Sequence, residues 1–226
     1  MSLDRPCPMS AEDPRSQAIQ YLRTEKAFGV TEISKIVPKA SAGKAEALNA
    51  LYEEFKGCQL CALGKTRTKL VFGAGSPEAA LMFVGEAPGF EEDKQGLPFV
   101  GAAGQLLTKI IVAMKLDRDK VYIVNCLKCR PPENRSPLPI ELATCDPILR
   151  RQIQIIRPKI ICALGKFAAQ AVLNTQEPIS RLRGRFFEMD GTRVMPTFHP
   201  AYLLRNPDDK KLVWNDMKMI MKELGG

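Results

Sequence analysis

The sequence has no apolar run close to the roughly 20 residues that a membrane-spanning helix needs. Its first eight residues, Met-Ser-Leu-Asp-Arg-Pro-Cys-Pro, contain no apolar core of the kind that defines a secretory signal peptide. These two absences predict a cytoplasmic protein that does not associate with a membrane. Disulfides are rare in a reducing cytoplasm, so they do not account for the seven cysteines of the chain.

Acidic residues are fewer than basic ones, 25 against 33, and the formal net charge is therefore +8. A basic surface favours a polyanion such as DNA, because binding releases condensed counterions. Charge alone is weak evidence, since many basic proteins bind no nucleic acid. The 226 residues suffice for one domain with a sizeable core, and the hydrophobic content of 45% is typical of a globular protein.

Short apolar runs alternate with segments of helical periodicity through most of the chain. The expected core strands cover residues 80–84, 121–125, 159–165 and 192–198, and two further strands are expected at 70–73 and 181–188. The expected helices cover residues 45–56, 101–111, 139–156, 166–173 and 208–224. This alternation predicts an α/β fold, a three-layer α/β/α sandwich with a central, mostly parallel four-stranded sheet.

The beginning of the chain differs from the rest, because it is rich in proline, serine and charge. We therefore predict an N-terminal extension over residues 1–44, partly disordered or helical, and one folded domain over residues 45–226. A partner-binding arm is the alternative interpretation of the extension.

A turn motif, Gly85-Glu-Ala-Pro-Gly89, follows the expected strand at 80–84. It must bend the chain sharply, because glycine tolerates positive φ and proline fixes φ. Glu91, Glu92 and Asp93 then crowd a predicted loop at the C-terminal end of the strand, where open α/β sheets bind ligands. An ordinary strand-to-helix turn with solvated acids explains the same pattern about equally well.

Four cysteines lie in three separate segments: Cys58-x-x-Cys61, Cys129 and Cys145. Four thiolates can close a tetrahedral metal site or hold an iron–sulfur cluster. Zinc sites of this kind usually have two CxxC pairs and this chain has one, so ordinary buried thiols remain an equal alternative. The other cysteines are set aside, because they lie at the end of a core strand, inside a core strand and near the N-terminus: Cys126, Cys162 and Cys7.

Three motifs resemble those of the family 4 uracil-DNA glycosylases, in the family's order. They are GEAPG with the following ED and GLPFVGAAGQLL from residue 85, NCLKCRPPENR from residue 125, and FHPAYLLRNP from residue 198. The resemblance covers roughly residues 50–224. It implies a DNA repair enzyme that flips uracil out of DNA and hydrolyses its N-glycosidic bond. It also implies that a 4Fe-4S cluster is bound by the quartet Cys58, Cys61, Cys129 and Cys145.

The same resemblance implies a pocket for the flipped base. A pocket of this kind needs a stacking face, which Phe99 fits, and a group that reads the base edge. The amide of Asn125 can donate to uracil O4 and accept from N3–H, but it reads uracil only if its orientation is fixed. We predict that a backbone group fixes this amide with its NH₂ towards O4. His199, the only histidine, is expected to donate to uracil O2 as negative charge develops there. The expected catalytic residues are Glu86, Glu92 and His199, and the expected substrate contacts are Ala87, Phe99, Asn125 and His199.

Four residues are expected to contact DNA. Arg130 and Arg135 lie in the loop that follows Asn125, and Leu204 and Arg205 could act as a wedge and a phosphate contact. A solvated basic loop and an ordinary helix-capping loop are the alternatives for these two segments. Ala87 and Gly89 replace the water-activating Asp and the thymine-blocking Tyr of the classical uracil glycosylases, so both of those roles are left unassigned.

Two other classes of protein fit part of this pattern. One is a non-catalytic iron–sulfur module of the same fold that binds DNA, and the other is an iron–sulfur electron carrier. Neither needs a set of base-reading residues. We therefore favour an active, monomeric glycosylase whose partner is uracil-containing DNA.

Overall fold

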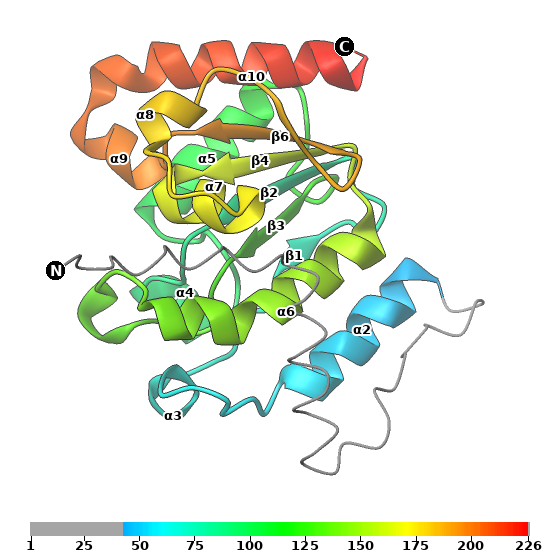
Figure 1. Ribbon diagram of the computed structural model, residues 1–226, viewed down its shortest axis with the longest axis vertical. Helices are drawn as coiled ribbons and strands as arrows, with labels where there is room; N and C mark the ends of the chain where they lie inside the picture. Colours follow the sequence, from blue (N-terminus) through cyan, green and yellow to red (C-terminus); the bar gives the residue numbers. More distant parts are fainter. Residues whose placement is uncertain (1–42, 226) are drawn as a thin grey trace, which may run out of the picture. The chain divides into compact units, whose positions relative to one another are not determined.

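The protein is described here from a computed structural model, which covers residues 43–225 (Figure 1). Residues 1–42 and residue 226 lie outside the described part. Almost all of the expected N-terminal extension therefore falls outside it, as does Cys7. No helix within residues 43–225 combines the length and the apolar character that crossing a membrane requires.

A mixed sheet of six strands forms the middle layer, in the order β1-β3-β2-β4-β6-β5. Its four central strands are parallel to one another: β3 (Tyr122–Asn125), β2 (Leu81–Gly85), β4 (Ile160–Leu164) and β6 (Thr192–Thr197). They confirm the predicted parallel sheet. Two short strands are added antiparallel at its edges, β1 (Ala74–Gly75) and β5 (Phe187–Met189).

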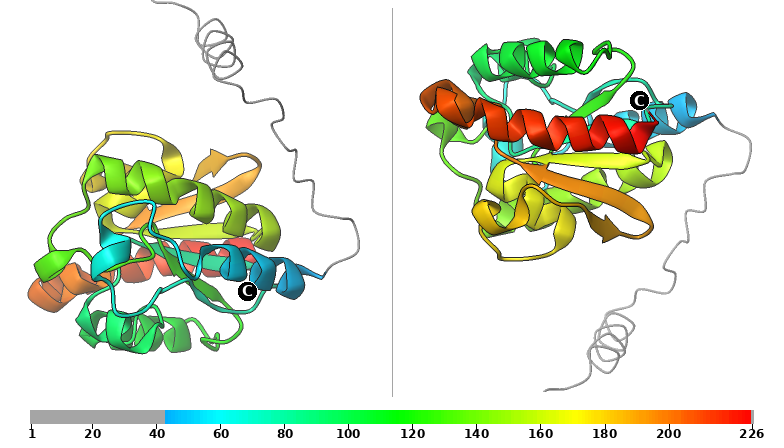
Figure 2. Two further views of the ribbon diagram at one scale, coloured as in Figure 1. Left: turned by 90° about the horizontal axis from the view of Figure 1, so that it is seen from below. Right: turned by 90° about the horizontal axis from the view of Figure 1, so that it is seen from above.

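Helices cover both faces of the sheet, as predicted (Figures 1 and 2). Successive strand residues point to opposite faces, so the strands feed two separate cores. Met82 and Val84 pack with α2 (Lys44–Phe55), α6 (Pro139–Ile156) and α7 (Gly165–Leu173). Leu81 and Phe83 pack on the other side with α5 (Ala102–Ala113) and α10 (Lys210–Leu224).

Three expectations about local structure were wrong. Residues 70–73 form no strand, because Val71 N–H donates only an isolated hydrogen bond, to the Lys128 carbonyl. The strand β1 begins only at Ala74. Residues 181–188 are not one strand, since α8 (Ile179–Leu182) comes first and Gly184 turns the chain at φ +80° before β5. The acids after Gly89 lie on a short helix, α4 (Phe90–Gln95), and not in a loop.

The remaining elements are short and lie outside the sheet. They are α3 (Leu63–Thr66), the 3-10 turn η1 (Pro132–Asn134), α9 (Pro200–Arg205) and η2 (Pro207–Asp209). The expected closing helix from residue 208 is thus divided into η2 and α10.

Candidate active site

The expected pocket residues meet at the C-terminal edge of the parallel strands. Gly85 ends β2 and is paired in register with Asn125, which ends β3. A Cβ atom at Gly85 would lie 2.3 Å from Asn125 Oδ1 and 2.5 Å from Phe99 Cζ. Only glycine leaves room for both side chains, because real Cβ atoms do not approach other heavy atoms that closely. Gly85, Phe99 and Asn125 therefore form one tightly packed group.

Asn125 is 1% exposed, and its Oδ1 atom has no hydrogen-bond partner among the described residues. Leaving a buried acceptor unpaired costs about 1–3 kcal/mol, so such groups are rare without a reason. An acceptor of this kind would be satisfied by an N–H donor on a ligand. Within residues 43–225, the amide oxygen is thus not held by a backbone donor.

Phe99 lies beside the imidazole of His199, with ring centroids 5.5 Å apart and planes inclined by 33°. Its φ of +52° places it in the left-handed region, which is uncommon for a bulky residue. The start of α5 holds it there, since a Cβ on Gly104 would lie 1.9 Å from the Phe99 carbonyl oxygen. Backbone strain of this kind tends to persist at functional sites.

His199 is the N-cap of α9, and its Nδ1 accepts a hydrogen bond from Ala201 N at 3.1 Å. A neutral imidazole with Nδ1 as acceptor carries its proton on Nε2, which remains a donor. Burial is the main cause that lowers the pKa of His199 to about 4, and Arg205 lowers it further while Glu92 opposes the shift. His199 is therefore neutral at physiological pH.

The two expected catalytic carboxylates lie in different environments. Glu86 follows β2 directly, and burial raises its pKa. Glu92 accepts hydrogen bonds from three backbone N–H groups, at 3.1 Å from Gly89 and 2.8 Å each from Val100 and Gly101. Glu92 thereby ties the start of α4 to the segment that carries Phe99.

The other two acids do not join Glu92, contrary to the expected crowding. Glu91 is exposed, whereas Asp93 is buried and accepts from Thr68 N with both oxygens, at 2.9 and 3.1 Å. The α4 helix separates the three carboxylates, because consecutive helical residues point about 100° apart.

Three of the four candidate ligand cysteines lie around one small apolar cluster. Cys129 is buried in it with Leu63 and Leu127, and Cys61 and Cys145 pack against it. The Arg67 guanidinium links the fourth cysteine to this group, because Nη1 donates to the Cys58 carbonyl at 2.6 Å and to Cys129 Sγ at 3.2 Å. Ala87 packs against the same cluster, so the turn after β2 lies between the base pocket and the cysteines.

Acid–base coupling also indicates that the four thiols are neighbours. Burial raises the pKa of Cys129, Arg67 lowers it, and Cys61 and Cys58 raise it further. Burial likewise raises the pKa of Cys145 to about 11, and Cys129 and Cys61 add to the rise. No three His, Cys, Asp or Glu side chains in the described part of the chain are arranged to hold a single metal ion. A cubane cluster places its four thiolates on four different irons, so it does not require them to meet at one point.

Cys126 and Cys162, which lie outside the predicted ligand set, are both buried. They are 3% and 0% exposed. Burial raises the pKa of the Cys126 thiol to about 12 and that of Cys162 well above its ordinary value.

The four expected DNA contacts differ in how far their side chains are already engaged. Arg135 donates to both oxygens of the buried Glu141 carboxylate, at 2.9 and 2.6 Å. Among the described residues, Arg130 donates a side-chain hydrogen bond only to Asn134, and it lies 5.0 Å from the centre of the exposed Phe90 ring. Leu204 is 48% exposed, whereas Leu203 is 1% exposed and belongs to the core. The structure therefore identifies Leu204 as the outward leucine of this motif, next to the exposed Arg205.

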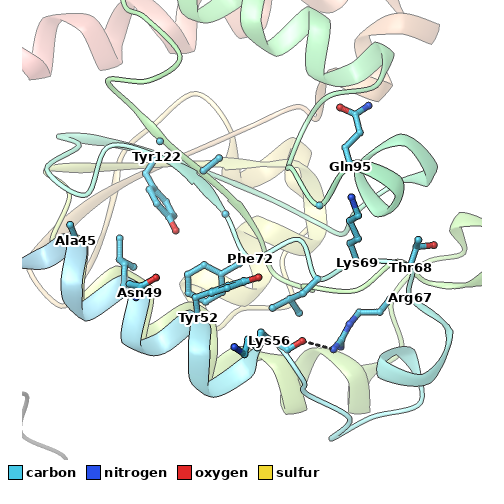
Figure 3. Close-up of a pocket in the computed structure, with 16 residues that line it drawn as sticks. Ala45, Asn49, Tyr52, Lys56, Arg67, Thr68, Lys69, Phe72, Gln95 and Tyr122 are labelled. Atoms are coloured by element: carbon cyan, nitrogen blue, oxygen red, sulfur yellow. Dashed lines mark hydrogen bonds between the residues drawn. The ribbon is translucent and has the colours of Figure 1, made fainter.

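A groove of about 700 Å³ lies between α2 and residues 67–75, away from the base pocket (Figure 3). Lys56, Arg67 and Lys69 line it, and none of the lining residues in the described part of the chain is an Asp or Glu. Lys56 is paired with Glu53, and Arg67 is engaged with the carbonyls of Lys56 and Cys58. Two of its three cationic side chains thus already make contacts within the protein.

Sequence comparisons agree with this geometry. The family model described as the uracil DNA glycosylase superfamily matches residues 72–218. The chain is 43% identical over 183 residues to the type-4 uracil-DNA glycosylase of Archaeoglobus fulgidus, covering 77% of this chain and 92% of that protein. It is 44% identical over 184 residues to the type-4 enzyme of Sulfurisphaera tokodaii, covering 77% and 84%. It is 42% identical over 179 residues to the type-4 enzyme of Thermotoga maritima, covering 77% and 93%.

Proposed function

The chain belongs to the uracil-DNA glycosylase superfamily, and we propose that the pocket around Asn125 is where it removes uracil from DNA. The activity is that of a uracil-DNA glycosylase in DNA repair. It hydrolyses the N-glycosidic bond and leaves an abasic site. The unpaired, buried Oδ1 of Asn125, beside Phe99 and His199, is the observation that carries the assignment of the pocket.

A base in a duplex must leave the stack before an enzyme can act on it. In the proposed complex the flipped uracil stacks on Phe99. Asn125 Oδ1 accepts from uracil N3–H, and the amide NH₂ donates to O4. This pairing satisfies the buried acceptor, which adds to the affinity for uracil.

Cleavage of the glycosidic bond moves electrons onto the departing base. The neutral His199 can donate from Nε2 to uracil O2, and it does so without carrying a charge that would bind other anions. A preorganised donor of this type contributes about 10²–10³-fold to a rate. Glu86 lies next to the pocket and is proposed to face the sugar and the attacking water. Glu92 acts by holding the loop of Phe99 through its three backbone contacts.

The quartet Cys58, Cys61, Cys129 and Cys145 is proposed to bind a 4Fe-4S cluster. The donor set fits, because three of the four thiols lie around one apolar cluster and Arg67 links the fourth cysteine, Cys58, to Cys129. Such a cluster would hold three segments together: the segment before β1, the loop after β3, and α6. We call these three segments the cysteine wall. Arg130, Leu204 and Arg205 are proposed to contact the DNA from both sides of the pocket. A monomer in the cytoplasm remains the expectation from the sequence.

A gel assay tests the proposed function. The substrate is an oligonucleotide with one uracil, and its abasic product is cut by alkali. The wild-type protein is expected to cleave it, and a matched thymine oligonucleotide should stay intact. Intact uracil DNA with iron-loaded protein would contradict the proposal and favour the non-catalytic binding module.

A further inference from the structure

Lys128 is a lysine in an unusual place. It is 1% exposed and ranks among the largest fully buried side chains of the described residues. Its Nζ donates to the backbone carbonyl of Asn125 at 2.6 Å. It takes part in none of the ion pairs found within residues 43–225. Its ammonium is therefore buried without a carboxylate partner at contact distance.

Lys128 directly precedes the buried Cys129 in the chain and follows the buried Cys126 by two residues. The backbone of Lys128 is fixed as well. Its carbonyl accepts a hydrogen bond from Val71 N at 2.9 Å. The residue thus connects the cysteine wall to the end of β3 through both its main chain and its side chain.

A buried ammonium costs several kcal/mol unless negative charge compensates it. Neutral thiols supply none. The thiolates of a ligated cysteine quartet would supply the negative charge that compensates the ammonium. Charge on the cysteines and charge on Lys128 would therefore stabilise each other.

We propose that Lys128 is a positioning residue, a buried counter-charge to the cysteine quartet whose ammonium fixes the main chain of the base reader Asn125. This inference rests on the proposed function, because it takes the quartet as cluster ligands and Asn125 as the base reader. It gives the cysteine wall a direct connection to the pocket. Asn125 lies against Gly85 and Phe99 without spare room, so a small shift of its backbone would displace the amide from the base edge.

The test uses Lys128→Met, which removes the charge and the donor, and Lys128→Arg, which keeps both. Lys44→Met is the matched control, because Lys44 Nζ also donates to a carbonyl, that of Ile156 at 2.9 Å, but is one-third exposed and paired with Glu78. Iron content, the reduction potential of the cluster and single-turnover uracil cleavage are measured for all three variants and the wild type.

Lys128→Met is expected to shift the reduction potential to more negative values, because a positive charge near the cluster is lost. Its cleavage rate at saturating DNA should fall about 10- to 100-fold, the scale of a 1 Å misplacement, with little change in the DNA concentration for half-saturation. Lys128→Arg should recover most of both properties, and Lys44→Met should match the wild type. If Lys128→Met does not fold while Lys128→Arg folds with full iron, the need for charge is supported directly.

A folded, iron-loaded Lys128→Met with wild-type potential and rate would overturn the proposal. A wild-type protein that cuts no uracil would instead overturn the proposed function. In that case the reduction potential still tests the role of Lys128 as a counter-charge, because that measurement needs no glycosylase activity.

Discussion

Asn125 and His199 follow directly from regular strands of the parallel sheet, whereas the four cysteines lie on loops and one helix outside it. The pocket residues inherit their positions from the hydrogen-bonded register of β2, β3, β4 and β6. Among the described residues, Cys129 is buried in a cluster with only Leu63 and Leu127, and Cys61 and Cys145 are partly buried against it. The pocket is therefore preorganised by backbone pairing, while the cysteine wall depends on whatever the cysteines bind.

Because of this contrast, we expect substitutions in the two regions to have different effects. Changes in the pocket should remove catalysis and leave the fold and the iron content intact. Changes in the cysteine wall should remove iron first and weaken the fold with it. Lys128 and Arg67 lie between the two regions and are expected to show a mixture of both effects.

The largest effect is expected for a ligand cysteine. Cys145→Ser should reduce the iron content from about four per chain to near zero, because a cubane needs four thiolates. It should also lower the melting temperature, since the three segments lose their link. Iron and sulfide analysis with a thermal melt measures both, and Cys126→Ala is the matched control, as a buried cysteine outside the quartet. Equal iron loss in the control would show that the ligand set is wrongly assigned.

Replacement of His199 is expected to affect only the pocket. His199→Ala should slow single-turnover uracil cleavage about 10²–10³-fold, the cost of losing one preorganised donor, with iron content unchanged. A wild-type rate in this variant would remove His199 from the chemistry.

The depressed pKa of His199 also predicts how stability depends on pH. The native pKa of about 4 lies below the ordinary 6.5, so between these values the unfolded chain binds a proton that the native state excludes. The contribution of His199 to the free energy of unfolding is therefore intact above pH 6.5 and is lost as pH falls towards 4. Melting temperatures at pH 7 and pH 5 should differ less for His199→Gln than for the wild type. Identical differences would mean that His199 titrates normally.

The two arginines of the loop after β3 should differ. Arg130→Ala is expected to reduce the slope of log DNA affinity against log salt concentration by about one unit, if Arg130 contacts one phosphate. Arg135→Ala removes the two Arg135 hydrogen bonds of the buried Glu141 carboxylate and leaves it the one from Leu138 N–H, so it should lower stability with a smaller change in slope. Binding titrations at several salt concentrations and denaturant melts distinguish them. Equal slopes in both variants and the wild type would exclude this loop from the DNA surface.

The smallest catalytic effect is expected for the outward leucine. Leu204→Ala should reduce cleavage of duplex DNA several-fold and leave single-stranded DNA unaffected, because a wedge fills the gap only in a stacked duplex. Leu203→Ala is the contrasting variant and should instead lose about 2–5 kcal/mol of stability, as a core truncation. Equal loss on both substrates with Leu204→Ala would argue against a wedge.

Much of the fold could be predicted from the sequence, because it is encoded locally. The buried parallel strands appear as continuous apolar runs, and α6 begins at Pro139 and ends at Ile156 as predicted. The edge strands could not be placed in the same way. β1 has only two residues, and its position depends on pairing with Tyr122 and Ile123 on a distant strand.

The candidate site was predicted as a set of residues, but the sequence does not show what each one contacts. The three backbone donors to Glu92 come from both sides of α4, so the sequence alone does not show that this carboxylate is hydrogen-bonded. Lys128 was missed because a lysine between two cysteines is usually solvated. Its only signal was its place three residues after the end of β3, and burial depends on tertiary packing.

The central claim is that Asn125 reads the base, and Asn125→Asp tests it most directly. The carboxylate repels uracil O4 and can accept from cytosine N4, while the strand register and the cysteine wall stay unchanged. Single-turnover cleavage of uracil and cytosine oligonucleotides is compared between the wild type and the variant, at equal iron content. Uracil cleavage is predicted to fall by at least ~10²-fold, because a buried polar group then faces the wrong partner, and weak cytosine cleavage is the predicted gain. A variant that cuts uracil as fast as the wild type would contradict the account, because the pocket would then read the base through other groups.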